Sequence, residues 1–214
     1  MNLEHLDKLG LSPCVAVLDI ETQSTALNAV IGTIGCVIKN LFTGKVVDVF
    51  YVRCELEEQF DSRVSDLPTL NWWEEQKKEY PRSYDEVFSP LLSRKPLHEA
   101  LDLLNAFLVF HLPNRPQVVG NGCEFDNAIV IDAMEYFDIK PAWDHGCNQS
   151  LRTAIMMGRM LLGIDPKYDL EFEGDKHHAL NDAQHEANYL REVFKAFIDR
   201  LGLSNNPCLI AKAK

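Results

Sequence analysis

Residues 15–25 read VAVLDIETQST, an apolar run that ends in two carboxylates, Asp19 and Glu21. A short run rich in Val, Leu and Ile predicts a buried strand. Side chains two positions apart in a strand share a face, so both carboxylates point to the same side of the sheet. Like charges at that spacing repel each other, and burying them is costly without a positive partner. Taken alone, the stretch is also explained by a strand that emerges into water at Glu21.

The flanking sequence predicts further strands and helices around this strand. Two more strands, over 30–39 and 46–54, are joined by the short turn NLFTGK, which favours an antiparallel meander. A further short strand, QVVGNG, covers 117–122. Apolar residues at helical spacing predict helices over 69–80, 96–111, 124–137, 149–162 and 178–201. Leading strands followed by alternating helix and strand indicate an α/β sheet with a mixed centre and helices on its faces.

Composition and charge limit the range of functions. The chain of 214 residues suits a single domain over 1–214, with a C-terminal tail over about 205–214. A formal net charge of −11 argues against a broad basic surface for tight, non-specific duplex binding. The six cysteines form no C-x-x-C pair, so we expect reduced thiols in a cytoplasmic protein. Because we find neither a signal-peptide pattern nor a membrane-spanning run, we expect no membrane partner.

Another carboxylate follows the strand QVVGN. The segment GNGCEFDNAIV, residues 120–130, places Asp126 in the first turn of a predicted helix. An acid at that position also satisfies free backbone N–H groups and the helix dipole, without any chemical role. Glu124 competes for the same position, and its place in the sequence does not exclude it.

The start of the last predicted helix carries a histidine and a carboxylate. In KHHALNDAQHEANYL, residues 176–190, His177 precedes the helix and Asp182 follows five residues later, with His178 as the rival histidine. Residues at steps of three and four predict a core-facing stripe made of Ala179, Ala183, Ala187, Leu190, Phe194, Phe197 and Leu201. Asp182 lies beside this stripe, near the buried face, where an acid needs a partner.

Together these acids predict a metal site. The four carboxylates are those of Asp19, Glu21, Asp126 and Asp182. Their convergence on one sheet is strongly unfavourable unless divalent cations offset the repulsion. Oxygen ligands favour Mg²⁺ or Mn²⁺ over zinc, and two such ions about 4 Å apart suit in-line attack on phosphorus. A nearby histidine, with an unperturbed pKa of roughly 6.5, is suited to take the proton of the attacking water.

The motifs LDIET, GNGCEFD and HHALNDA, in this order and spacing, resemble those of the DEDDh-type 3′→5′ exonucleases of the ribonuclease H-like superfamily. The resemblance covers nearly the whole chain. It implies a mixed five-stranded sheet, a three-strand meander followed by parallel strands, flanked by helices. The four residues between His177 and Asp182 match the histidine variant and select His177 over His178. TLNWWEEQ, residues 69–76, is similar to the group that contains the T-even phage exodeoxyribonuclease A and the actinobacterial adenosine-preferring exoribonuclease.

The resemblance implies roles for individual residues. It assigns the metal ligands as Asp19, Glu21, Asp126 and Asp182, and the general base as His177. Asp126 is expected to act partly through water. The substrate contacts expected around this site are Thr22, Trp72, Trp73, Phe125 and Arg152.

Several of these substrate contacts have a second explanation. Adjacent residues of a helix point about 100° apart, so Trp72 and Trp73 are not expected to share one role. One belongs to the core, and the other stacks on a terminal base, a contact worth ~1–3 kcal/mol. Phe125 is better explained as core. Arg152, seven residues before Arg159 on one helical face, either guides phosphates or forms salt bridges on an acidic surface.

The leading prediction is a metal-dependent exonuclease that acts on the 3′ end of single-stranded RNA or DNA and releases nucleoside 5′-monophosphates. An acidic surface would grip a duplex poorly, and no residue indicates a contact to the 2′-OH that would decide between RNA and DNA. A structure-specific endonuclease on the same fold and an inactive scaffold that binds nucleic acid or protein are the alternatives. The tail NNPCLIAKAK carries an apolar patch that docks on its own domain or on a second copy, which would be a homodimer.

Overall fold

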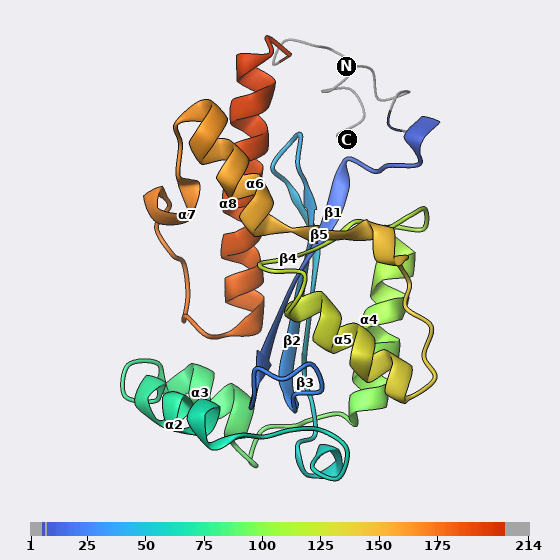
Figure 1. Cartoon of the computed structure of the whole chain (residues 1–214), viewed down its shortest axis with the longest axis vertical. Helices are drawn as coiled ribbons and strands as arrows, with labels where there is room; N and C mark the ends of the chain where they lie inside the picture. Colours follow the sequence, from blue (N-terminus) through green and yellow to red (C-terminus); the bar gives the residue numbers. More distant parts are fainter. Residues whose placement is uncertain (1–5, 7, 204–214) are drawn as a thin grey trace.

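The computed structural model describes residue 6 and residues 8–203. Its centre is a single sheet of five strands in the order β3-β2-β1-β4-β5 (Figure 1). The strands are β1 (Cys14–Thr22), β2 (Ile31–Asn40), β3 (Val46–Arg53), β4 (Val118–Gly120) and β5 (Asn148–Ser150). The pairs β1–β2 and β2–β3 are antiparallel, whereas β1–β4 and β4–β5 are parallel. The predicted meander followed by parallel strands is therefore confirmed.

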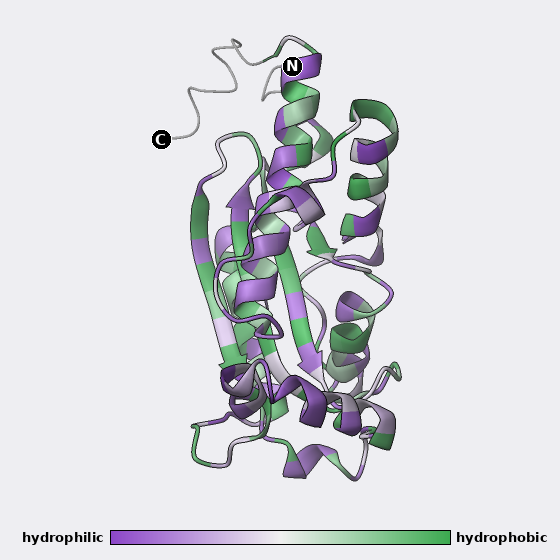
Figure 2. Ribbon diagram, turned by 90° about the vertical axis from the view of Figure 1, so that its left-hand side faces the viewer, coloured by the Kyte–Doolittle hydropathy of each residue, from purple (hydrophilic) through white to green (hydrophobic). Residues whose placement is uncertain are grey.

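Helices cover both faces of the sheet. The longer ones are α2 (Leu67–Gln76), α3 (Pro81–Phe88), α4 (Leu97–His111), α5 (Asp126–Tyr136), α6 (Leu151–Met157) and α8 (Ala179–Arg200). Shorter turns are η1 (Glu57–Gln59), η2 (His145–Cys147), the π-helical η3 (Gly158–Leu162) and α7 (Pro166–Asp169). Helices α4 and α5 lie on one face and α6 and α8 on the other, while α2 and α3 lie at the end of the sheet where α8 begins (Figure 1). Figure 2 shows the strands largely hydrophobic and the helices at that end largely hydrophilic.

Two helix predictions were wrong in detail. The helix predicted over 69–80 begins earlier, at Leu67, where the Asp66 side chain accepts a hydrogen bond from the Thr69 amide at 2.8 Å. It ends at Gln76, and a separate helix, α3, starts at Pro81, because a residue before proline is disfavoured in helical conformation. The helix predicted over 149–162 starts two residues late, since Asn148–Ser150 form β5, and it turns π-helical after Met157.

The predicted stripe of α8 is confirmed only in its first half. Ala179, Ala183, Ala187 and Leu190 are buried. Beyond them Phe197 is partly buried against the same core, Val193 is buried in place of Phe194, and Leu201 is exposed. The steps of three and four keep the period of an α-helix, so the loss of burial after Leu190 reflects the packing around α8 and not the spacing of the stripe.

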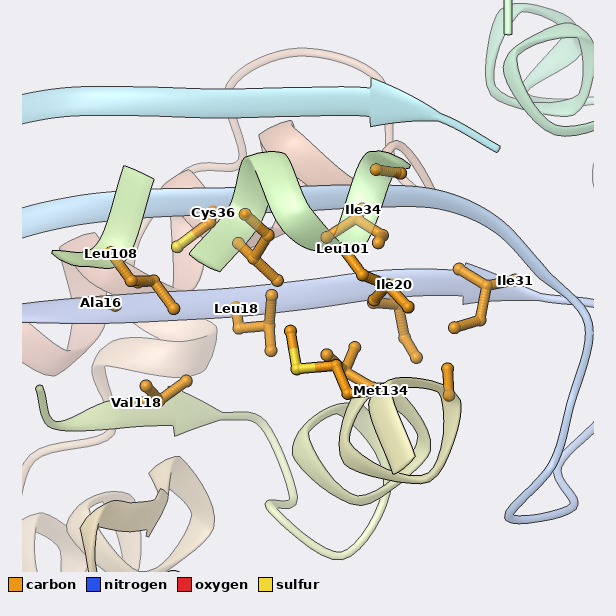
Figure 3. Packing of buried hydrophobic residues seen from close by; sticks show 14 of the residues in the cluster. Ala16, Leu18, Ile20, Ile31, Ile34, Cys36, Leu101, Leu108, Val118 and Met134 are labelled. Atoms are coloured by element: carbon orange, nitrogen blue, oxygen red, sulfur yellow. The ribbon is translucent and has the colours of Figure 1, made fainter. Parts of the chain in front are cut away.

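Alternate residues of β1 enter two different cores. The core under α4 and α5, shown in Figure 3, includes Ala16, Leu18, Ile20, Ile34, Cys36, Leu101, Leu108, Val118 and Met134. Val15 and Val17 point to the opposite face and pack in the core beneath α6 and α8. Asp19 and Glu21 continue this second row, because side chains two positions apart share a face. Both carboxylates therefore point toward α8.

Gly35 allows the start of α8 to approach the sheet closely. Gly35 on β2 pairs directly with Asp19 on β1. A Cβ atom at this position would lie only 2.4 Å from the carbonyl group of Ala179, the first residue of α8. A glycine is thus needed beside Asp19 to bring the beginning of α8 to the end of β1.

Gly35→Ala is expected to lower the free energy of unfolding by about 3 kcal/mol, because backbone and not a movable side chain blocks the added methyl group. Urea unfolding of the variant measures the loss. Gly146→Ala is the matched control, since a Cβ there meets nothing within 4 Å. Equal stability of the two variants would contradict the role of Gly35.

Other expectations meet the structure only in part. Cys14, Cys36, Cys54, Cys123 and Cys147 are free thiols, as predicted. Among the described residues, no helix combines the length and the apolar character needed to span a bilayer. The tail over about 205–214, with its proposed docking on the domain or on a second copy, lies outside the described residues. The single-domain boundary and the cytoplasmic location stay predictions.

Candidate active site

Four predicted acids and a histidine meet where β1 ends, β4 ends and α8 begins. Asp19 and Glu21 come from β1, and Asp126 is the first residue of α5, directly after the loop that follows β4. Asp182 lies in the first turn of α8, and His177 lies in the loop before that helix. Ligand atoms of Glu21, His177 and Asp182 all lie within 4.8 Å of one another.

The carboxylates disturb one another's ionisation. Burial raises the pKa of Asp19 well above its usual range, and Asp126, Glu21, Glu186 and Asp182 raise it further. Burial and neighbouring carboxylates act in the same way on the pKa of Glu21.

For the two acids at helix starts, Asp126 and Asp182, hydrogen bonds from backbone N–H groups partly offset the rise in pKa. Burial raises the pKa of Asp126 to about 7, while amides that include those of Asn121 and Gly122 lower it. Burial raises the pKa of Asp182 to about 6, and the amides of His177 and His178 act against the rise. The carboxylates therefore repel one another, and a divalent cation bound between them would offset this repulsion.

The residues present fit a hard divalent cation. Asp19 Oδ2 and Asp182 Oδ2 are buried, and neither has a hydrogen-bond partner among the described residues. Within the same part of the chain, no lysine or arginine forms an ion pair with the clustered carboxylates. Buried oxygens without partners are rare and costly in folded proteins. A set of carboxylate oxygens in this state is the donor set that Mg²⁺ and Mn²⁺ prefer.

His177 is the histidine beside the carboxylates. Its backbone has φ +62°, which is uncommon for a residue other than glycine and recurs at functional sites. Its imidazole lies edge-on to the rings of Trp72, at 4.9 Å, and Tyr80, at 5.4 Å. Burial and then Lys176 lower its pKa, against the opposite effect of Glu79, so the ring is neutral near pH 7 and able to accept a proton.

The rival residues lie elsewhere. The ring of His178 stacks on Tyr51 of β3 at 4.6 Å, and its strongest charged neighbour is Glu86. The exposed carboxylate of Glu124 accepts a hydrogen bond from Arg152 Nη1 at 2.7 Å, whereas Asp126 is buried in the cluster. This placement agrees with the prediction of His177 rather than His178, and of Asp126 rather than Glu124, as site residues.

The two tryptophans have different surroundings. Trp73 is 1% exposed, and its Nε1 donates a hydrogen bond of 2.9 Å to the carbonyl oxygen of Thr22. This bond fixes α2 against the end of β1. Trp72 is 39% exposed and lies beside His177. Trp73 is thus the core residue, and Trp72 is the one with a surface free for a base.

The remaining predicted substrate contacts are already engaged within the protein. The hydroxyl of Thr22 is buried and donates to the Ser24 carbonyl oxygen at 2.7 Å. Phe125 is partly buried against the core. Arg152 pairs with Glu124 over the loop before Asp126, and its own amide bonds to that loop. Arg159 forms a salt bridge with Asp165 at 2.7 Å. Both arginines therefore form salt bridges at the surface, which was the second explanation for them.

Glu186 is a fifth carboxylate in this cluster and was not predicted from the sequence. It lies on α8, four residues after Asp182, and is 5% exposed. Burial, Asp126 and Asp182 hold its pKa well above the usual range. The signal was present in the sequence, because residues four apart on a helix share a face, and Ala187 beside it belongs to the buried stripe.

Comparison with solved structures supports this fold. The nuclease domain of 3′hExo, a DEDDh family member bound to rAMP, aligns with a TM-score of 0.59 at 11% identity, over 90% of this chain and 94% of that one. The cell-death related nuclease CRN-4 aligns with a TM-score of 0.60 at 16% identity, over 89% and 64% of the two chains. E. coli exonuclease I in complex with a dT13 oligonucleotide gives 0.61 at 13% identity, over 92% of this chain but 45% of the other.

The chain therefore spans less than half of exonuclease I and just under two thirds of CRN-4, and at these identities the likeness concerns the fold. A search of curated protein sequences finds no match. The sequence model of the 3′-5′ exoribonuclease Rv2179c-like domain, in contrast, matches residues 14–194. The matched residues include the three motifs that resemble those of DEDDh exonucleases. They also include all five strands of the sheet. The chain belongs to the family of the 3′-5′ exoribonuclease Rv2179c-like domain and is a 3′-5′ exonuclease.

Proposed function

We propose that this exonuclease hydrolyses the terminal phosphodiester bond at the 3′ end of single-stranded nucleic acid and releases nucleoside 5′-monophosphates. Two divalent cations, Mg²⁺ or Mn²⁺, are held by Asp19, Glu21, Asp126 and Asp182. The observation that carries the proposal is the group of buried carboxylate oxygens without partners where β1 ends and α8 begins.

The chemistry divides between the cations and the chain's own groups. When bound, the cations stabilise the charge that develops on the phosphoryl oxygens and make water a stronger nucleophile. The oxygen of the attacking water forms the new bond to phosphorus. At the same time, the neutral imidazole of His177 takes the proton from this water. The bond from phosphorus to the 3′ oxygen of the shortened strand breaks, and that oxygen takes up a proton from the surrounding water. The lowered pKa of His177 keeps its imidazole free to act as this base.

Among substrates, RNA is the first expectation. The family to which the chain belongs is that of a 3′-5′ exoribonuclease domain. One of the similar structures holds rAMP and another a dT13 oligonucleotide, so DNA stays the second candidate. The net charge of −11 disfavours tight binding of a duplex on electrostatic grounds.

Digestion of end-labelled strands tests this proposal. Single-stranded RNA and DNA of matched sequence, labelled at the 5′ end, are incubated with Mg²⁺, Mn²⁺ or EDTA. We expect a metal-dependent ladder that shortens from the 3′ end, runs further on RNA and is absent with Asp182→Asn. Internal cuts would indicate an endonuclease, and uncut strands in the presence of metal would favour a scaffold.

Trp72→Ala is expected to raise KM for a single-stranded substrate about tenfold, because stacking on a base contributes ~1–3 kcal/mol. Steady-state kinetics on a short oligonucleotide measures the change. Trp73→Ala is the contrasting variant: it opens a cavity in the core and removes the bond to Thr22, so it should lower the free energy of unfolding by ~3–5 kcal/mol. An unchanged KM for Trp72→Ala would contradict base stacking.

A further inference from the structure

Glu186 is the one member of the carboxylate cluster that the DEDDh motifs do not include. Its side chain is 5% exposed, and Oε2 has no hydrogen-bond partner among the described residues. It lies one helical turn after Asp182, on the same face of α8. A buried carboxylate oxygen in this state needs a partner that the described chain does not supply.

The charged groups that act on Glu186 include the acids of the predicted metal site. The groups that most strongly disfavour its charged form are Asp126 and Asp182. Glu186 in turn acts on Asp19 and Glu21. The side chain therefore lies within the field of all four acids that we assign to the metal site.

Two groups outside the acidic cluster, the hydroxyl of Tyr189 and the ammonium group of Lys167, also interact with the Glu186 carboxylate. The hydroxyl of Tyr189, a residue 1% exposed, donates a hydrogen bond to its carboxylate. Lys167 of α7 favours the charged form from a distance, but no ion pair joins the two in the part of the chain that the structure describes. Tyr189 thus engages the Glu186 carboxylate, while Oε2 has no hydrogen-bond partner among the described residues.

A purely structural role fits these contacts poorly. A glutamine would accept the same hydrogen bond from Tyr189 without placing a further charge beside Asp126 and Asp182. The charge is useful only if a cation is present. The orientation by Tyr189 is also what metal ligands require, because a hydrogen bond to the ligand fixes its direction.

We propose that Glu186 is a fifth carboxylate ligand of the divalent metal site, beside the four acids already assigned to it, and that Tyr189 is its positioning residue. The inference rests on the proposed function, because it needs the cations that the other acids hold. With Glu186 ionised, the acidic set carries more negative charge than two divalent cations neutralise. The expected consequence is tighter metal binding than four carboxylates alone would give.

Calorimetric titration with Mn²⁺ alone tests this assignment without any measurement of activity. We expect Glu186→Gln to weaken Mn²⁺ binding at least tenfold and Tyr189→Phe to weaken it by a smaller factor. Glu192→Gln, on the same helix and paired with Lys195 at the surface, is the matched control and should bind as the wild type does.

The outcomes separate the inference from the proposed function. If the wild type and Glu186→Gln bind Mn²⁺ equally tightly, Glu186 is no ligand and the inference is overturned. If the wild type itself takes up no Mn²⁺, the metal site as a whole fails. If Glu186→Gln binds weakly but Tyr189→Phe binds as the wild type does, the role of Tyr189 is overturned and that of Glu186 is supported.

Discussion

Replacing Asp19 by asparagine is expected to reduce the rate of 3′-end cleavage by about a thousandfold or more. Burial raises the pKa of Asp19, and Asp126, Glu21, Glu186 and Asp182 raise it further, so its charge interacts with the whole cluster. Asparagine keeps the shape of the side chain but removes the charge. A loss of ~4 kcal/mol of transition-state stabilisation corresponds to about a thousandfold in rate.

Single-turnover cleavage of a 5′-labelled RNA at saturating Mg²⁺ measures the effect of Asp19→Asn. Asp102→Asn, a substitution on the exposed side of α4, is the control and should cleave at the wild-type rate. The metal-free Asp19→Asn protein should be at least as stable as the wild type, since a repelled charge has been removed. Cleavage by Asp19→Asn at more than about a tenth of the wild-type rate would contradict the assignment of Asp19 to the metal site.

The metal-free protein is expected to become more stable as the pH is lowered from about 8.5 to 6.5. Burial raises the pKa of Asp126 to about 7, and the pKa values of Asp19, Glu21 and Glu186 lie well above their usual range. In this window the folded state binds more protons than the unfolded state. Stability therefore falls as the pH rises, by about 1.4 kcal/mol per pH unit for each extra proton bound.

Below about pH 6.5 the histidines oppose this trend, because burial lowers the pKa of His177, His178 and His185 and the unfolded state then binds the additional protons. Thermal unfolding at a series of pH values, with EDTA, records the slope. A divalent cation at pH 8 should reverse the loss: at a hundred times Kd it adds about 2.7 kcal/mol, which is roughly 5–11 °C in Tm. A metal-free Tm that rises with pH across this window would contradict the repulsion within the cluster.

Local patterns in the sequence were enough to predict most of the fold and the main acids. The alternation along β1 placed Asp19 and Glu21 on one face, and helix starts placed Asp126 and Asp182 next to strand ends. These features depend on neighbours within a few residues. The meander also followed from short connections, because two strands joined by a tight turn pair with each other.

The features that were missed depend on contacts between distant segments. β5 is a short polar strand, NQS, that exists because it pairs with β4, and its composition gives no strand signal. The bond from Trp73 to Thr22, which decides between the two tryptophans, joins positions 51 residues apart. Glu186 was hidden for the same reason, since its burial depends on the sheet and on Asp126 across from α8.

The central claim is that carboxylates at the end of β1 and the start of α8 hold divalent cations. The most direct test is a crystal structure of the Mn²⁺-loaded protein with AMP, measured at a wavelength where manganese scatters anomalously. We expect anomalous peaks among the carboxylates of Asp19, Glu21, Asp126, Asp182 and Glu186, with the phosphate of AMP beside them. Peaks only at exposed acids elsewhere, or no peak in this cluster at saturating Mn²⁺, would contradict the claim.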